Sequence, residues 1–125
     1  MRLLLDTHIV LWCLEDSPRL TQRARDLVTD PDNEVLVSAA SLWEIAIKHA
    51  FGRLQLDLAT LEPGLRRTGF DPLPITGSHA LAVANLPEHH RDPFARSLAA
   101  QSIAEGLRLV THDTALVPYG TAILV

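Results

Sequence analysis

The sequence predicts an α/β fold in which a central, mostly parallel sheet is flanked by helices, giving three layers. Short apolar runs, typical of buried strands, recur along the chain. Longer segments with helical spacing of apolar side chains lie between them, and this alternation is typical of βαβ units with parallel strands. A chain of 125 residues is sufficient for one hydrophobic core, so we expect a single domain over residues 1–125.

Two apolar runs in the first half of the chain are expected to form buried strands, Leu3–Leu5 and Val35–Val37. Apolar side chains with helical spacing follow the first run, over residues 9–14. A second helix is expected over residues 22–28, because Thr21 is a good N-cap and the apolar side chains of the segment fall on one face.

The middle of the chain is expected to contain two further helices and a weak strand. Ser38 or Ser41 opens the first of these helices, which ends before Gly52. Residues 56–67 are expected to form the other helix. Residues 70–75 are expected to form at best an edge strand, because two prolines in this segment lack the amide hydrogen that a central strand requires.

The last part of the chain returns to the same alternation. Residues 79–86 are apolar enough for a short helix, and residues 92–105 have an N-cap aspartate, a proline at the first helical position and a glycine after the end. Strands are expected over residues 107–110 and 122–125, with a short helical segment that begins at residues 111–113 between them.

Composition limits the classes of function. The net charge is −4, which counts mildly against a nucleic-acid partner, although an acidic metal site would itself contribute negative charge. The single cysteine, Cys13, excludes an internal disulfide and a cysteine-based zinc site. No apolar run approaches the length of a membrane span or of a signal-peptide core, so we expect a cytoplasmic protein with no membrane partner.

Acidic residues stand at several predicted junctions between strands and helices. Asp6 and Asp113 follow strands, Glu44 lies in the helix after the second strand, and Asp92 begins a helix. Because ligands bind at the carboxyl ends of strands in open parallel sheets, these acids could converge in one crevice. Converging carboxylates favour a hard cation such as Mg²⁺ or Mn²⁺, and the chemistry that fits is phosphodiester hydrolysis.

A purely structural interpretation of the same acids is also open. Ser41 and Glu44 have the spacing of a capping box, Asp92 precedes a proline as an N-cap does, and Asp113 can cap the segment after it. Acidic side chains are favoured at helix N-termini by the helix dipole. Spacing alone therefore leaves both interpretations open.

Five stretches, in order along nearly the whole chain, carry a family resemblance. They are Leu4-Leu5-Asp6-Thr7-His8 with Leu11-Trp12, Ser38-Ala39-Ala40-Ser41-Leu42-Trp43-Glu44-Ile45-Ala46-Ile47-Lys48, His90-Arg91-Asp92-Pro93-Phe94, Leu98-Ala99-Ala100-Gln101 and Leu109-Val110-Thr111-His112-Asp113. They resemble PIN-domain toxins of the VapC type, and the second stretch is the most specific.

The resemblance implies a three-layer PIN-like fold and a Mg²⁺-dependent endoribonuclease, the toxin of a type II toxin–antitoxin pair. It implies neutralisation by a VapB-type antitoxin, and it gives metal-site roles to Asp6, Glu44 and Asp113. Members of the family commonly pair, so a homodimer or a toxin–antitoxin hetero-oligomer is expected.

The sequence departs from the family at one acid. The segment that usually reads Asp-Pro-Phe-Asp-Arg here reads Asp92-Pro93-Phe94-Ala95-Arg96, so a metal-site acid falls on Ala95. Asp92 is a weak substitute because its side chain is expected to cap the helix. A natural replacement and an inactivating substitution made to protect an expression host both fit, and the intact flanking pattern favours the second. Either should weaken metal binding and activity.

Further side chains are candidates for supporting roles. Thr7 and Thr111 stand beside the acids and could orient a metal-bound water or a phosphate, with ordinary capping as the alternative. Four basic residues could contact RNA phosphates or an antitoxin, although solvated surface charge is the commoner fate of such residues. They are Lys48, Arg53, Arg91 and Arg96.

The histidines and tryptophans receive structural or surface interpretations. No histidines show zinc-ligand spacing, so we interpret four of them as surface or RNA-contact residues. They are His8, His89, His90 and His112. Trp12 and Trp43 lie on apolar helix faces, which favours core or dimer-interface positions over base stacking.

Three hypotheses follow from the sequence. The first is a toxin that hydrolyses RNA with Mg²⁺ or Mn²⁺, weakened at Ala95, in which Asp6 and Asp113 hold the metal and Glu44 completes the site or positions the attacking water. The second is an inactive binding module that captures antitoxin or RNA without cleavage. The third is a metal-free protein whose acids serve only as helix caps.

Overall fold

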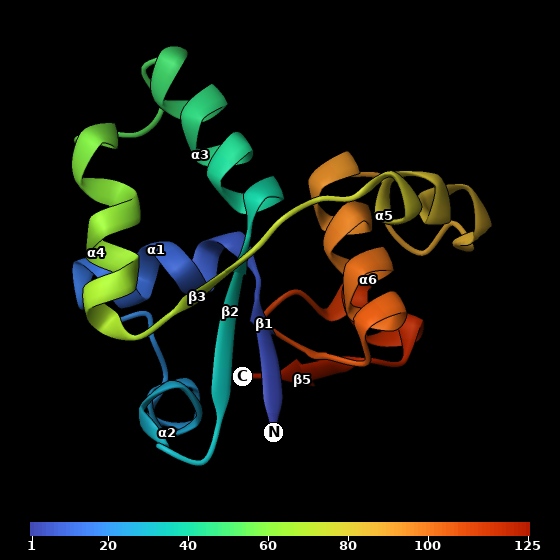
Figure 1. Ribbon diagram of the computed structural model, residues 1–125, viewed down its shortest axis with the longest axis horizontal. Helices are drawn as coiled ribbons and strands as arrows, with labels where there is room; N and C mark the ends of the chain where they lie inside the picture. Colours follow the sequence, from blue (N-terminus) through green and yellow to red (C-terminus); the bar gives the residue numbers. More distant parts are fainter.

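The computed structural model describes residues 1–125, and its centre is a single sheet of five parallel strands (Figure 1). The strands are β1 (Arg2–Leu5), β2 (Glu34–Ser38), β3 (Asp71–Leu73), β4 (Arg108–Thr111) and β5 (Ala122–Leu124), in the order β3-β2-β1-β4-β5. The predicted α/β class is therefore confirmed. β3, the strand that contains a proline, lies at an edge of the sheet as the sequence predicts.

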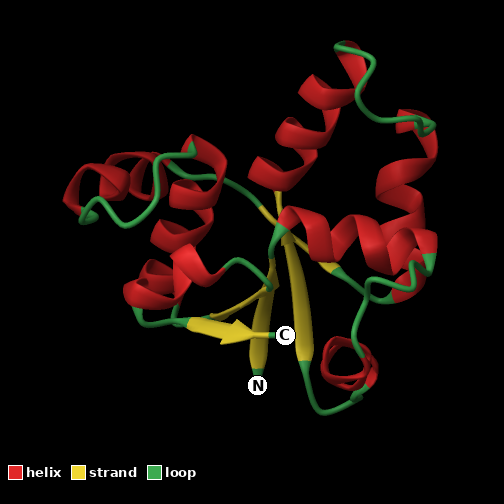
Figure 2. Cartoon of the chain, turned by 180° about the vertical axis from the view of Figure 1, so that it is seen from behind, coloured by secondary structure: helices red, strands yellow, loops and turns green.

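Helices cover both faces of the sheet, as the two opposite views show (Figures 1 and 2). The α-helices are α1 (Thr7–Glu15), α2 (Gln22–Thr29), α3 (Ala39–Ala50), α4 (Leu61–Thr68), α5 (Gly77–Ala82) and α6 (Pro93–Glu105). Three short 3₁₀ helices complete the chain: η1 (Leu58–Thr60), η2 (Val83–Asn85) and η3 (Thr114–Tyr119). No helix is both long enough and apolar enough to cross a membrane.

The sheet separates two hydrophobic clusters. Leu3 and Leu5 of β1 face the cluster that α1, α2, α3 and α4 close, whereas Leu4 faces the cluster closed mainly by α6 and η3. Side chains of a strand alternate between the two faces, and both faces are buried here, so β1 is apolar at consecutive positions. Burial on both sides leaves the ends of the strands as the places where polar residues can gather.

Two sequence predictions about helix starts are wrong. The helix expected over residues 56–67 is divided into η1 and α4, because the Asp57 side chain accepts a hydrogen bond from the Ala59 amide and caps η1 instead. The capping box at Ser41 does not form, because Ser38 caps α3 by accepting from the Ala40 amide. Ser41 is buried inside the first turns of α3.

Candidate functional site

Asp6 and Thr111 meet at the carboxyl ends of the two central strands. Leu5 of β1 is paired with Val110 of β4, so Asp6, which follows β1, lies beside Thr111, the last residue of β4. The Thr111 hydroxyl donates to the Asp6 Oδ2 atom over 2.6 Å, and the Asp6 amide donates to the Val110 carbonyl over 2.9 Å. These two residues, 105 positions apart, therefore share the edge of the sheet that the strand pattern predicted.

The Asp6 carboxylate is held in a buried position. It is 8% exposed, and its Oδ1 atom accepts a hydrogen bond of 2.8 Å from the Thr7 amide at the start of α1. Burial raises the pKa of Asp6 above its usual value, and the negative charge of Glu44 adds to this, against the lowering effect of the hydrogen bonds and of His8. A cation next to Asp6 would relieve both unfavourable contributions.

Glu44 approaches this edge from α3. Thr7 donates its hydroxyl hydrogen to the Ser41 hydroxyl over 3.0 Å, which joins the starts of α1 and α3. Ser41 and Glu44 are three residues apart and so lie on the same face of α3. The Glu44 side chain is 14% exposed and pairs with Lys48 over 3.1 Å. Glu44 is therefore a partly buried acid near Asp6, and it is not part of a capping box.

Asp113 lies on the same edge, after β4, and both of its carboxylate oxygens accept hydrogen bonds. Oδ1 accepts from the Ala115 amide at the start of η3 over 3.0 Å, and Oδ2 is 2.7 Å from the His90 Nε2 atom. Burial raises the pKa of Asp113, but hydrogen bonds from His90 and Ala115 and the electrostatic attraction of the His90 and His112 rings outweigh burial and lower it. Asp113 is thus stabilised as a carboxylate.

The start of α6 contributes Asp92 and Ala95. Asp92 is the N-cap, and its Oδ2 atom accepts from the Ala95 amide over 2.9 Å, as the sequence predicted. The Ala95 side chain is 7% exposed and belongs to the hydrophobic cluster that contains Leu4 and Leu98. The position in the family motif that usually carries an acid is therefore a buried methyl group in the first turn of α6.

The chemistry of these donors fits a hard divalent cation. Asp6, Glu44 and Asp113 offer carboxylate oxygens, which Mg²⁺ and Mn²⁺ prefer. The acids are satisfied instead by Thr111, Lys48 and His90, and no group of three or more acidic, histidine or cysteine side chains is arranged to hold a metal ion. The edge therefore offers carboxylate oxygens of the kind that Mg²⁺ and Mn²⁺ prefer, although these carboxylates do not surround a formed metal site.

The four basic residues singled out in the sequence fall into different environments. Arg53 and Arg91 are exposed, whereas Lys48 pairs with Glu44. The Arg96 guanidinium turns inward and donates to the backbone carbonyls of the loop before α6 and to the Tyr119 hydroxyl. Arg96 therefore anchors a loop of the chain itself, which leaves few of its N–H groups for a phosphate.

Two groups of aromatic side chains flank the edge. Trp12 packs against the exposed His112 ring at a centroid distance of 4.7 Å, and the exposed His8 ring lies 5.9 Å from Trp12. Trp43 meets Phe94 edge to face at 5.3 Å and is 61% exposed. The core position expected as one option for Trp43 is therefore wrong, because this residue lies on the side of α3 that faces solvent.

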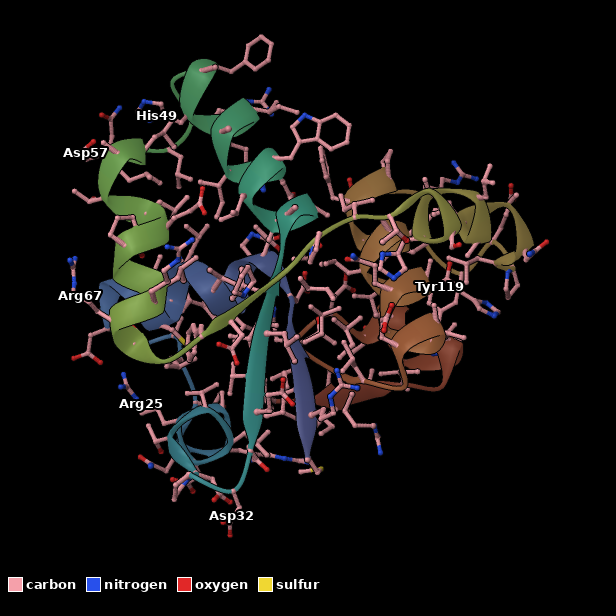
Figure 3. The ribbon with its side chains drawn as sticks, in the orientation of Figure 1. Arg25, Asp32, His49, Asp57, Arg67 and Tyr119 are labelled. Atoms are coloured by element: carbon pink, nitrogen blue, oxygen red, sulfur yellow. The ribbon has the colours of Figure 1, made fainter.

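Sequence reasoning missed the role of His90. We expected His90 to be a surface or RNA-contact residue, but it is partly buried and bonded to Asp113, 23 residues away. No local pattern indicates this contact, because it depends on how the loop before α6 folds against η3. Figure 3 shows Tyr119 beside α6, with the labelled Arg25 and Arg67 on the opposite side of the view and Asp32 at its lower end.

Comparison with known proteins agrees with this fold and this motif order. Residues 3–119 match the PIN domain family. The chain is 32% identical over 119 residues to Ribonuclease VapC22 of Mycobacterium tuberculosis, which covers 90% of this chain and 88% of that protein.

The chain belongs to the PIN-domain family, in its VapC branch.

Solved structures show the same PIN fold at low sequence identity. The chain matches VapBC2 from Rickettsia felis bound to a promoter DNA fragment with a TM-score of 0.71 and 16% identity, over 100% of this chain and 98% of that one. It matches FitAcB from Neisseria gonorrhoeae with a TM-score of 0.68 and 19% identity, over 98% and 96% of the two chains. The chain thus shares its overall fold with both of these structures.

Proposed function

We propose that this PIN-domain protein is the toxin of a type II toxin–antitoxin pair and a metal-dependent endoribonuclease, impaired at Ala95. The observation that carries the proposal is the buried Asp6 carboxylate at the carboxyl edge of β1 and β4, next to Glu44 and linked through Thr111 to the Asp113 segment. Burial and the negative charge of Glu44 both disfavour the ionised form of Asp6, so a cation beside this carboxylate would be favourable. The name of the similar protein VapC22 as a ribonuclease supports RNA as the substrate.

Each residue of the edge has a distinct task in this proposal. Asp6 and Asp113 would hold Mg²⁺ or Mn²⁺, and Glu44 would complete the site or position the attacking water. When bound, the metal supplies a Lewis acid for the phosphate and lowers the pKa of a bound water. Thr111 fixes the rotation of the Asp6 carboxylate through its 2.6 Å hydrogen bond, and Thr7 holds α3, and with it Glu44, against α1.

The partners follow from the same proposal. Two of the similar structures are toxin–antitoxin proteins, VapBC2 and a toxin–antitoxin complex from Klebsiella pneumoniae. We infer a VapB-type antitoxin as the protein partner, and a homodimer or toxin–antitoxin hetero-oligomer as the assembly. Arg53 and Arg91 are exposed cations available to RNA phosphates or to acidic groups of the antitoxin. Lys48 could join them only by leaving Glu44.

One observation favours a second function, a binding module that does not cleave. The Ala95 methyl group is buried in a hydrophobic cluster, so the position of the missing acid supplies no oxygen to a metal. Such a protein could still capture its antitoxin or RNA. The two functions differ in whether an acid at position 95 creates activity.

The test is RNA cleavage by the Ala95→Asp variant, purified without antitoxin and shown to be folded. We expect cleavage of a random RNA pool that depends on Mg²⁺ or Mn²⁺ and exceeds the activity of the unchanged chain. The double variant Asp6→Asn/Ala95→Asp is the control for a contaminating nuclease and should be inactive. A folded Ala95→Asp variant that cleaves nothing with either metal would exclude the ribonuclease and favour the binding module.

A further inference from the structure

The imidazole ring of His90 is fixed at both of its nitrogens. The Asp92 amide donates to Nδ1 over 3.1 Å, so Nδ1 is an acceptor and carries no hydrogen. The ring proton of neutral His90 is then on Nε2, which faces the Asp113 Oδ2 atom at 2.7 Å. The structure therefore defines the tautomer, and His90 is a donor to Asp113.

The loop that carries His90 is itself anchored. The Tyr119 hydroxyl accepts from the His90 amide over 3.1 Å and donates to the Pro87 carbonyl over 2.9 Å. Arg96 donates to the carbonyls of His90 and Pro87, both over 3.2 Å, and to Val83 on η2. Side chains of η3 and α6 thus hold the backbone on both sides of the ring.

We propose that His90 is a positioning residue that fixes the Asp113 carboxylate in the orientation needed to bind a divalent cation. With Nε2–H on Oδ2 and the Ala115 amide on Oδ1, rotation of the carboxylate is restrained, while each oxygen keeps a lone pair for a metal. Hydrogen-bonded partners of ligating carboxylates typically change metal affinity about 10–100-fold when they are removed. The inference rests on the proposed function, because it assumes that Asp113 is a ligand.

Two substitutions of His90 test the hydrogen bonds of its two ring nitrogens separately. In His90→Asn, the side-chain oxygen takes the place of Nδ1 and accepts from the Asp92 amide, but the side chain is too short to reach Asp113. In His90→Gln, the amide group reaches the place of Nε2 and donates to Asp113, but the acceptor for Asp92 is lost. His90→Asn therefore keeps the acceptor for the Asp92 amide and loses the donor to Asp113. His90→Gln keeps the donor to Asp113 and loses the acceptor for the Asp92 amide.

The experiment measures Mn²⁺ affinity by calorimetry for the unchanged chain, His90→Asn, His90→Gln and the exposed neighbour variant His89→Asn. We expect His90→Asn to bind Mn²⁺ about 10–100-fold more weakly, and His90→Gln and His89→Asn to stay within about threefold of the unchanged chain. If His90 matters only because its Nδ1 atom accepts from the Asp92 amide, the order is reversed and His90→Gln is the weaker binder. That reverse order, or equal affinities in all four proteins, overturns the proposal.

An NMR measurement keeps the test independent of metal binding. The carboxyl carbon resonance of Asp113 in metal-free protein reports the His90 donor directly. It should shift in His90→Asn, and stay near its original position in His90→Gln. If Mn²⁺ binds none of the proteins but this shift occurs, the proposed function fails. The His90–Asp113 hydrogen bond is then real, but it has no role in metal binding. If the resonance is unchanged in His90→Asn, the positioning role itself is wrong.

Discussion

Two histidine–carboxylate pairs in this molecule have the same local geometry and different surroundings. His90 and Asp113 are 2.7 Å apart at the carboxyl edge of the sheet, and His79 and Glu105 are 2.7 Å apart between α5 and α6. In both pairs a backbone amide donates to Nδ1 over 3.1 Å, so Nε2 faces the carboxylate. The ring geometry alone does not distinguish the two pairs.

Their neighbours do distinguish them. The His79 ring also accepts from the Gln101 side chain, which is bonded to Ser38, so this pair belongs to a buried polar network that is satisfied within the fold. Asp113 instead lies beyond Thr111, whose hydroxyl bonds to the buried Asp6. A histidine–carboxylate pair becomes a candidate site only where a second, poorly solvated acid lies nearby.

The largest expected difference concerns metal binding. Asp113→Asn should lower Mn²⁺ affinity by more than about 100-fold, because loss of a ligand exceeds the typical effect of losing an outer hydrogen-bond partner. Glu105→Gln, which alters the matching acid of the other pair, should leave the affinity within about threefold. Calorimetry that finds Glu105→Gln to bind Mn²⁺ as weakly as Asp113→Asn would show that the two pairs do not differ in metal binding.

The next difference concerns stability. His79→Ala should lower the free energy of unfolding by about 1–3 kcal/mol, because it removes the partner of Glu105, the acceptor of the Thr76 amide and one of the two acceptors of the buried Gln101 side chain. Urea denaturation measures this loss. The affinity for Mn²⁺ should change little, and a loss of affinity as large as that of His90→Asn would mean that the two pairs are coupled.

A smaller effect is expected from Tyr119→Phe. The hydroxyl bonds to the Pro87 carbonyl, the His90 amide and Arg96, and a typical hydrogen bond contributes about 1 kcal/mol. We expect a loss of about 1 kcal/mol in unfolding free energy and a less than tenfold loss of Mn²⁺ affinity, because Arg96 still holds the loop. An unchanged melting temperature together with unchanged affinity would show that the anchor is redundant.

The smallest effect is the pH dependence contributed by Asp6. Its pKa is raised in the folded chain, mainly by burial, so the folded state binds this proton more tightly than the unfolded state. The resulting stability is fully present below the unfolded pKa of Asp6 and is lost as pH rises through the folded pKa. In metal-free protein, Asp6→Asn should therefore remove part of the decline in stability that accompanies rising pH, as denaturation at several pH values would show. Identical pH profiles would contradict a raised pKa.

The sequence predicted the parts of this site that depend on local pattern. Asp6 and Asp113 could be placed because Asp6 directly follows one apolar run and Asp113 comes three residues after the end of another, and parallel strands align the ends of such runs. Asp92 could be assigned as an N-cap because Pro93 follows it. The sequence left the start of α3 open between Ser38 and Ser41, and Ser38 is the N-cap, so the capping box that the spacing of Ser41 and Glu44 suggested does not form.

The contacts of His90 and Arg96 could not be predicted in the same way. His90 meets Asp113 across 23 residues, and Arg96 bonds to carbonyls of an irregular loop and to Tyr119. Neither contact has a periodicity or a capping pattern, since both depend on how η2, η3 and α6 pack together. The acids at strand ends were therefore accessible to sequence reasoning, and the groups that orient them were not.

We propose that the carboxyl edge of the sheet is a metal site whose missing ligand falls at position 95. The most direct test compares the Mn²⁺ affinity of the unchanged chain with that of Ala95→Asp by calorimetry. We predict an affinity at least about tenfold higher in Ala95→Asp, with a rise in melting temperature on adding Mn²⁺ that exceeds the rise in the unchanged chain, because a new carboxylate at this buried position needs a cation. Equal affinity in the two folded proteins would contradict the claim.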